Sequence, residues 1–305
     1  MSFSISKLGL ELISQIVFNN KSRKLFFGMA GGLIIMINSL EELAARVKAE
    51  PNNPEILKEL GNLYFREGDY DQAIEQYQAS LRIDPVFYKS LYNLGNTYYK
   101  IGDYDKAVAK WQEAIKARPD FDHAYFNLGY YYFQRGYMRE AIKALKEASR
   151  ISPNSPDTHH YLGLAYHQTG QLNEAVEEFK RAIELEGTDP DYHYNLANTY
   201  YDIANYEGAA EEWAKTLQYR EDDSKARNNY CDALLQLGRY DEGLKEIDEV
   251  LKKTPNYPPA LCTKGELLES VGRMEEAKAI FSRLQDIIKD NSDWELLGKY
   301  VSTKL

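Results

Sequence analysis

Cysteine is scarce in this sequence of 305 residues, which contains only Cys231 and Cys262. Two cysteines cannot build a disulfide framework or a four-cysteine zinc site. Histidine is scarce as well, with five copies, and the sequence has neither a Walker-type glycine loop nor an HExxH motif. We therefore expect no metal, no cofactor and no enzymatic activity.

Positive charge is also in short supply. Lysine and arginine number 37 against 47 aspartates and glutamates, so the formal net charge is −10 and the isoelectric point is about 5.2. An acidic chain is repelled by the phosphate backbone, so nucleic acid is not expected among its partners. Tyrosine, in contrast, is abundant, with 25 copies, which indicates that it occupies a regular place along the chain.

Small residues follow a regular period along most of the chain. They recur every 34 positions, and a second series follows the first by seven positions. Such self-similarity is the signature of a repeat architecture. The first series is Gly61, Gly95, Gly129, Gly163, Ala197, Cys231 and Gly265, and the second is Gly68, Gly102, Gly136, Gly170, Ala204, Gly238 and Gly272.

The stretch SLYNLGNTYYKIGDYDKAVAKWQEAIKARP, residues 90–119, resembles the tetratricopeptide repeat. Seven repeats in register cover residues 54–291 and begin at residues 54, 88, 122, 156, 190, 224 and 258. The resemblance implies an all-α fold, a right-handed α-solenoid of helical hairpins. Residues 38–53 then form a capping half-repeat, and residues 292–305 form a carboxyl-terminal capping helix that begins near Ser292.

Local signals support helical hairpins without reference to the family. Leu94, Tyr98 and Ile101 have helical spacing before Gly102, which can end the helix in the left-handed conformation. Asp103 can then cap the second helix. Each hairpin has apolar residues on both flanks and needs neighbours to bury them.

The predicted functional surface is the concave groove. In tetratricopeptide arrays, positions 2, 5, 6, 9, 12 and 13 of each repeat tend to face it, and we call these the groove positions. Here asparagine recurs at positions 6 and 9, and an asparagine amide can pair with both the N–H and the C=O of a peptide bond. The series resembles the asparagine ladder in the repeat domain of O-linked N-acetylglucosamine transferases, and neighbouring aromatic side chains would supply apolar area. The alternative is that these residues only pair neighbouring helices. The candidate groove residues are Asn62, Asn93, Asn96, Asn127, Asn195, Asn198, Asn229, Tyr92, Tyr99, Phe126, Phe133, Tyr194, Tyr201, Lys58 and Lys89.

Charge changes sign along these positions, from lysine and arginine in the early repeats to aspartate and glutamate in the later ones, which would orient a guest chain. The alternative is a solvated polar face. A carboxylate clamp known in the family is matched by Lys58, Asn62 and Asn93, but the third repeat has His123 and Asn127 where basic residues are needed. Adjacent glutamates on second helices, Glu177–Glu178 and Glu211–Glu212, are expected to face solvent.

Residues 1–37 do not follow the repeat. Residues 25–37 are uncharged and mostly apolar, and as a helix they would span roughly 20 Å against about 30 Å of bilayer hydrocarbon. A membrane anchor through residues 25–40 is the favoured interpretation, and it predicts a membrane-associated protein. A cleaved signal peptide stays open, as does a leader before a translation start at Met29 or Met36, which would leave a soluble cytoplasmic array.

These patterns predict a non-enzymatic scaffold or adaptor that binds an extended or helical segment of a partner protein during complex assembly. Two alternatives stay open. The chain could be an accessory subunit that presents substrate proteins to an enzyme, or a scaffold that associates with itself.

Overall fold

The structure, a computed structural model, describes residues 42–305. Within this range the chain is helical between its turns and contains no strand, which confirms the predicted all-α solenoid class. Residues 1–41, which include the membrane anchor predicted through residues 25–40, lie outside the described residues. In the described range, no helix combines the length and the apolar character needed to cross a bilayer.

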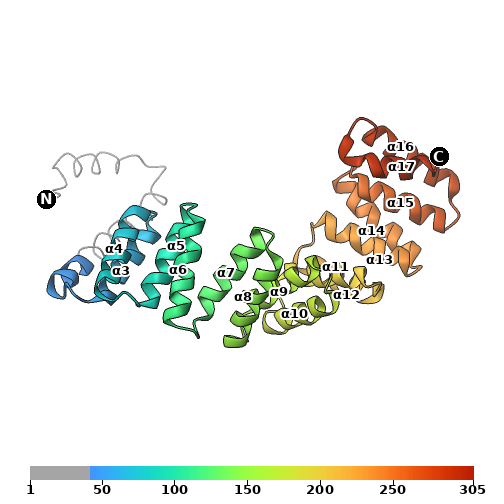
Figure 1. The fold of residues 1–305 in the computed structure, drawn as a ribbon. Coiled ribbons are helices and arrows are strands. Elements are labelled where there is room, and N and C mark those ends of the chain that lie inside the picture. Colours follow the sequence, from blue (N-terminus) through green and yellow to red (C-terminus); the bar gives the residue numbers. More distant parts are fainter. Residues whose placement is uncertain (1–41) are drawn as a thin grey trace, which may run out of the picture. The chain divides into compact units, whose positions relative to one another are not determined.

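The chain divides into two compact units between Asp120 and Phe121. In the first unit, residues 42–49 are helical and two helical hairpins follow (Figure 1). Within each hairpin the two helices pack against each other, and α4 of the first hairpin packs against α5 of the second. The helices of this unit are α3 (Pro54–Arg66), α4 (Tyr70–Ile83), α5 (Tyr88–Lys100) and α6 (Tyr104–Ala117).

The second unit continues the same pattern through five further hairpins and a short terminal helix (Figure 1). The hairpins stack in chain order, and each second helix packs on the first helix of the next hairpin. The elements are α7 (Asp122–Gln134), α8 (Met138–Ile151), α9 (Pro156–Gln168), α10 (Leu172–Leu185), α11 (Pro190–Asp202), α12 (Tyr206–Tyr219), α13 (Ser224–Gln236), α14 (Tyr240–Lys253), α15 (Pro258–Ser270), α16 (Met274–Ile288), the 3₁₀ turn η1 (Ser292–Trp294) and α17 (Glu295–Ser302).

The turn inside each hairpin follows the predicted chemistry. Gly102 has φ 84°, its N–H donates to Tyr99 O, and the N–H of Asp103 donates to Tyr98 O at 2.9 Å. The Asp103 side chain then caps α6 by accepting from the N–H of Lys106. The same left-handed turn recurs in every hairpin of the described chain, but at Ala204 it is made by a residue that carries a Cβ, with φ 60°.

The two helices of a hairpin approach closely at the first small-residue position. A Cβ added to Gly95 would lie 2.6 Å from Trp111 Cδ1, so only glycine allows the indole ring to lie there. Consecutive hairpins then share one core. Leu145 of α8, Phe179 of α10 and Leu196 of α11 belong to a single buried cluster. Each hairpin therefore depends on its neighbours for burial, as repeat arrays do.

The array ends on α17, which packs against the last hairpin. Val301 is fully buried, and Trp294 and Leu297 pack against the cluster that contains Phe281. The 3₁₀ turn η1, which precedes α17, is capped by Asn291, whose side chain accepts from the N–H of Asp293 at 2.9 Å.

Candidate functional site

A cleft of about 640 Å³ opens in the first unit between helical residues 42–49 and the first helices of two hairpins, α3 and α5. Its walls combine apolar side chains with both signs of charge, and its asparagines occupy groove positions. The lining residues are Glu42, Leu43, Arg46, Glu59, Asn62, Phe65, Arg66 and Asn93.

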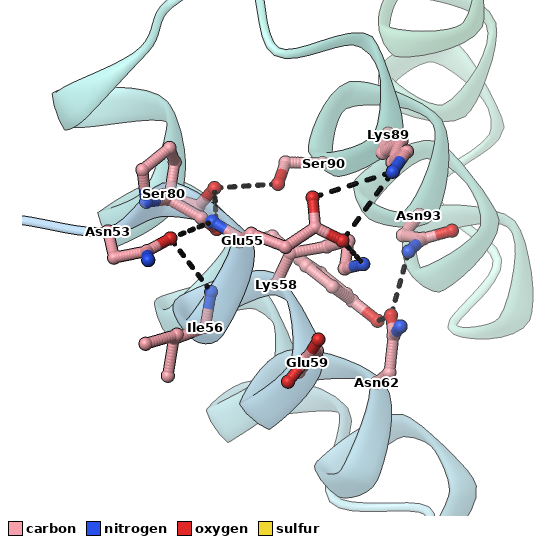
Figure 2. A network of polar contacts seen from close by, with 12 residues as sticks. Asn53, Glu55, Ile56, Lys58, Glu59, Asn62, Ser80, Lys89, Ser90 and Asn93 are labelled. Atoms are coloured by element: carbon pink, nitrogen blue, oxygen red, sulfur yellow. Dashed lines mark hydrogen bonds and ion pairs between the residues drawn. The ribbon is translucent and has the colours of Figure 1, made fainter. Parts of the chain in front are cut away.

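Two asparagine side chains that line the cleft bond to each other. Figure 2 shows Asn93 of α5 directed at Asn62 of α3, with Asn93 Nδ2 donating to Asn62 Oδ1 at 2.7 Å. The hydroxyl of Tyr77, on α4, donates to the same oxygen at 2.8 Å. Because Asn62 Oδ1 accepts two hydrogen bonds, the orientation of its amide is determined. The Nδ2 group of Asn62 and the Oδ1 atom of Asn93 keep their hydrogen-bonding capacity.

Beside this pair, a carboxylate neutralises the predicted lysines. Glu55 contacts both Lys58 and Lys89, with Lys89 Nζ 3.5 Å from its Oε2 (Figure 2). Burial alone would raise the pKa of Glu55, but hydrogen bonds and charge from Lys58, and then from Lys89, lower it. Lys58, the lysine that a carboxylate clamp would use, and the groove candidate Lys89 are therefore already bound to a carboxylate of the chain itself.

Inside the cleft, Arg46 forms an ion pair with Glu59 at 2.7 Å. Arg66 is exposed, and no ion pair or hydrogen bond of its side chain occurs among the described residues. Considering residues 42–305 alone, the cleft therefore offers one unpaired cation next to the apolar side chains of Leu43 and Phe65 and the two amides.

The contact between Asn93 and Asn62 is one case of a recurring interaction. Position 6 of a repeat donates to position 9 of the repeat before it, 31 residues earlier. Asn229 Nδ2 lies 3.5 Å from Asn198 Oδ1, and Thr263 Oγ1 donates to Asp232 Oδ1 at 2.9 Å. The polar ladder thus links successive hairpins through its own side chains.

One repeat replaces this link with a histidine. Leu164 stands at position 9, so Asn195 instead lies 2.9 Å from His160 Nε2. Burial lowers the pKa of His160, and its neutral ring can accept from the Asn195 amide.

The aromatic groove residues of the second unit gather in one cluster. Tyr161 makes edge contacts with Phe126, Tyr130 and Phe133, with ring centroids 4.9–5.9 Å apart. All four side chains are half-buried, so the cluster keeps exposed apolar area. Phe126 and Phe133 were predicted as groove residues; Tyr130 and Tyr161 interrupt the asparagine series at positions 9 and 6.

The remaining predicted groove residues do not gather in one site but lie at separate places along the helices. Asn96 Oδ1 accepts from Trp111 Nε1 at 2.8 Å, and Tyr194 lies 3.4 Å from the Asn229 amide nitrogen. The rings of Tyr99 and Tyr201 pack against Trp111 and Trp213 respectively. Tyr92 lies on α5 and Asn127 on α7, and both are half-buried.

A repeated ionic contact at position 4 was not predicted from the sequence. His159 Nδ1 lies 2.6 Å from Glu178 Oε2, and His193 Nδ1 lies 2.6 Å from Glu212 Oε2. The expectation that both glutamate pairs face solvent was therefore wrong for Glu178 and Glu212. Adjacent helical residues point about 100° apart, so one member of each pair can face inward. The sequence did contain a signal for this contact. A histidine is followed 19 residues later by a glutamate within one repeat, and the same pair recurs in the next repeat.

The cysteines are poor nucleophiles. Cys231 is fully buried, and burial raises the pKa of its thiol well above the ordinary value. Burial, with the nearby carboxylate of Glu266, raises the pKa of Cys262 to about 12. In residues 42–305, no group of three or more histidine, cysteine, aspartate or glutamate side chains is arranged to hold a metal ion.

Family models identify the repeats. The model described as the cilia and flagella-associated protein 70 C-terminal domain matches residues 36–256, and a tetratricopeptide repeat model matches residues 232–292. No curated protein sequence matches the chain significantly.

Solved structures share the fold. "YrrB: a TPR protein with an unusual peptide-binding site" is 21% identical, with a TM-score of 0.55, and the match covers 61% of this chain and 96% of that one. MamA is 26% identical, with a TM-score of 0.51 and coverage of 56% and 94%. A tetratricopeptide repeat protein from Parabacteroides merdae is 17% identical, with a TM-score of 0.54 and coverage of 82% and 98%. Such repeat proteins are generally binding scaffolds without catalytic activity.

Proposed function

Because the chain belongs to the tetratricopeptide-repeat family described by the C-terminal domain of cilia and flagella-associated protein 70, we propose that it is a non-enzymatic scaffold that binds an extended segment of a partner protein. The contact site in the first unit is the cleft lined by Asn62 and Asn93. Membrane association through residues 25–40, a role in complex assembly and self-association stay predictions from the sequence.

The observation that carries this proposal is the oriented amide pair. Asn62 Oδ1 already accepts from Tyr77 and Asn93, so Asn62 offers N–H donors while Asn93 offers a carbonyl acceptor. A peptide bond presents the complementary carbonyl and N–H. Two oriented side chains can therefore hold a main chain with little demand on its sequence, and Phe65 and Leu43 supply apolar contact for a guest side chain.

The test is affinity capture with the full chain and with Asn93→Ala, after circular dichroism confirms equal helicity at the temperature of the assay. The matched control is Gln76→Ala on α4, which also removes an amide side chain but lies outside the cleft lining. Proteins that bind through the cleft should be lost from Asn93→Ala and retained by Gln76→Ala. Equal capture by all three proteins would overturn the proposal.

Recognition of the main chain can be tested with the captured segment. Once cross-linking has identified it, two synthetic versions are compared by fluorescence anisotropy. N-methylation of the peptide bond at the cleft should weaken binding, whereas alanine at a neighbouring side chain should have a smaller effect. The reverse order would show that side chains, not the main chain, carry the recognition.

A further inference from the structure

Three carboxylates in the second unit lie near enough to Tyr201 for their charges to act on its hydroxyl. Tyr201 and Asp202 lie at the end of α11, Asp232 on α13 and Glu266 on α15. Burial and the charges of Asp232, Glu266 and Asp202 raise the pKa of Tyr201 to about 12. We call Tyr201, Asp202, Asn228, Asp232 and Glu266 the acidic face.

The charge of this face is poorly compensated. Asp202 lies 2.8 Å from His167 Nε2, but neither Asp232 nor Glu266 contacts a lysine or arginine among the described residues. Their contacts are neutral: Thr263 donates to Asp232, and Tyr300 donates to Glu266. Burial and the charge of Glu266 raise the pKa of Asp232 to about 6.

A second observation is a buried acceptor without a partner among the described residues, beside these carboxylates. Asn228 is 4% exposed, and its Oδ1 atom has no hydrogen-bond partner within residues 42–305. Asn228 precedes Asp232 by four residues on α13, so the two lie on the same side of that helix. A buried acceptor without a partner destabilises the free protein, and a donor supplied by a ligand would remove that penalty.

We propose that the acidic face binds a lysine or arginine side chain of an extended partner segment, which rests on the scaffold function proposed above. Such a side chain supplies several N–H donors and a permanent positive charge. The carboxylates of Asp232 and Glu266 neutralise this charge. Acidic segments and nucleic acids are repelled by the same charges.

The probe is a fluorescent, acetylated peptide that alternates arginine with alanine. Its control replaces each arginine by citrulline, which has nearly the same shape without the charge. Binding to the full chain is measured by fluorescence anisotropy at about 0.15 M salt, where distant surface charges are largely screened. We expect the arginine peptide to bind at least about tenfold more tightly than the citrulline peptide.

Two variants with the same change of charge locate the site. Asp232→Asn with Glu266→Gln removes the charges of the acidic face. Asp241→Asn with Glu275→Gln removes two exposed charges from the second helices α14 and α16. The first pair should weaken arginine-peptide binding at least about tenfold, and the second less than about twofold. Equal losses in the two variants, or equal binding of the two peptides, would overturn the proposal.

A measurement on the unmodified chain avoids dependence on variants that fail to fold. Carboxyl resonances followed by NMR during a pH titration should show the pKa of Asp232 falling when the arginine peptide is present. An unchanged pKa at saturating peptide would overturn the proposal. If capture still depends on Asn93 but no arginine peptide binds, only this inference fails; if the peptide binds while capture ignores Asn93, the cleft assignment fails instead.

Discussion

His193 lies between two oxygen acceptors, with Nδ1 2.6 Å from the Glu212 carboxylate and Nε2 3.0 Å from the main-chain oxygen of Gly187. His159 has the same arrangement with Glu178 and the oxygen of Pro153. In the next repeat Arg227 occupies the equivalent position, contacts Glu246 and donates from Nη2 to Glu221 O. A histidine ring can donate to both acceptors only when both of its nitrogens carry a proton. In that charged form each of the two histidines makes the contacts that Arg227 makes in the next repeat.

These contacts predict a pH-dependent stability. The hydrogen bond to Glu212 raises the pKa of His193, although burial alone would lower it. The stabilisation is then fully present below the unfolded value of about 6.5 and is lost as pH rises through the folded pKa. Hydrogen bonds from His193 and Lys215 overcome the effect of burial and lower the pKa of Glu212, so its contribution is lost as pH falls through that lowered value. The protein should be most stable between the lowered pKa of Glu212 and the raised pKa of His193. The urea concentration at the unfolding midpoint should decrease when the pH is taken above or below that range.

The control for that experiment replaces both histidines by the residue found in the next repeat. The double substitution His159→Arg and His193→Arg keeps a cation at each position but removes its titration near neutral pH. The alkaline fall of the urea midpoint should disappear. If the double variant loses stability with rising pH as the parent does, other groups cause the dependence.

Ala204→Gly should stabilise the protein by about 1 kcal/mol, because a left-handed residue with a Cβ is strained by roughly 1–2 kcal/mol. Ala204 has φ 60° and is exposed. The measurement is the free energy of unfolding. The reciprocal change is Gly170→Ala, at a glycine with φ 74°. The added Cβ has no neighbour within 4 Å, so backbone strain alone should destabilise this variant by a similar amount. A change of the same sign in both variants would contradict the argument.

Gly95→Ala should destabilise the protein by about 1–3 kcal/mol, the usual cost of overpacking. The added Cβ would lie 2.7 Å from Trp111 Nε1, which donates to Asn96. At the equivalent position three repeats later stands Ala197, which carries that Cβ, and there Trp213 Nε1 has no partner among the described residues. Unfolding in urea measures the loss of stability.

The reciprocal change tests the cause. Ala197→Gly should let Trp213 Nε1 reach Asn198, so the indole N–H resonance of Trp213 should move downfield. The new hydrogen bond, worth about 1 kcal/mol, should offset most of the helix penalty of glycine, also about 1 kcal/mol. If the indole N–H resonance of Trp213 does not move, the Cβ of Ala197 is not what keeps Trp213 Nε1 from the Asn198 side chain.

Asn62→Ala should cost more stability than Asn93→Ala. Tyr77 is 1% exposed, and without Asn62 its hydroxyl loses its acceptor, at a cost of about 1–3 kcal/mol. Asn93 is half-buried and contributes one of two donors to Asn62, so its loss should cost less than about 1 kcal/mol. Unfolding of the double variant Asn62→Ala with Tyr77→Phe should show a smaller loss than the sum of the single changes. Equal effects of Asn62→Ala and Asn93→Ala would contradict this account.

Most of the fold could be read from local signals. The turn at Gly102 and the cap at Asp103 depend on residues within a few positions of each other, and the 34-residue period places the same signals in every hairpin. The partners of polar side chains were harder to predict. His193 and Glu212 lie on opposite helices of one hairpin, and their contact depends on helix rotation, which two adjacent glutamates in the sequence do not define.

The sequence by itself determined the repeat, the helical class and the absence of a cysteine framework, because these follow from spacing and composition. Only the tertiary structure decided that Asn93 bonds to Asn62 of the preceding repeat and that Glu55 binds the lysines beside them. From the sequence alone, each of these side chains could have paired with any of several polar residues on its own helix or on a neighbouring one. The stacking of one hairpin on the next selects among them, since hydrogen bonds require atoms about 3 Å apart in a defined direction.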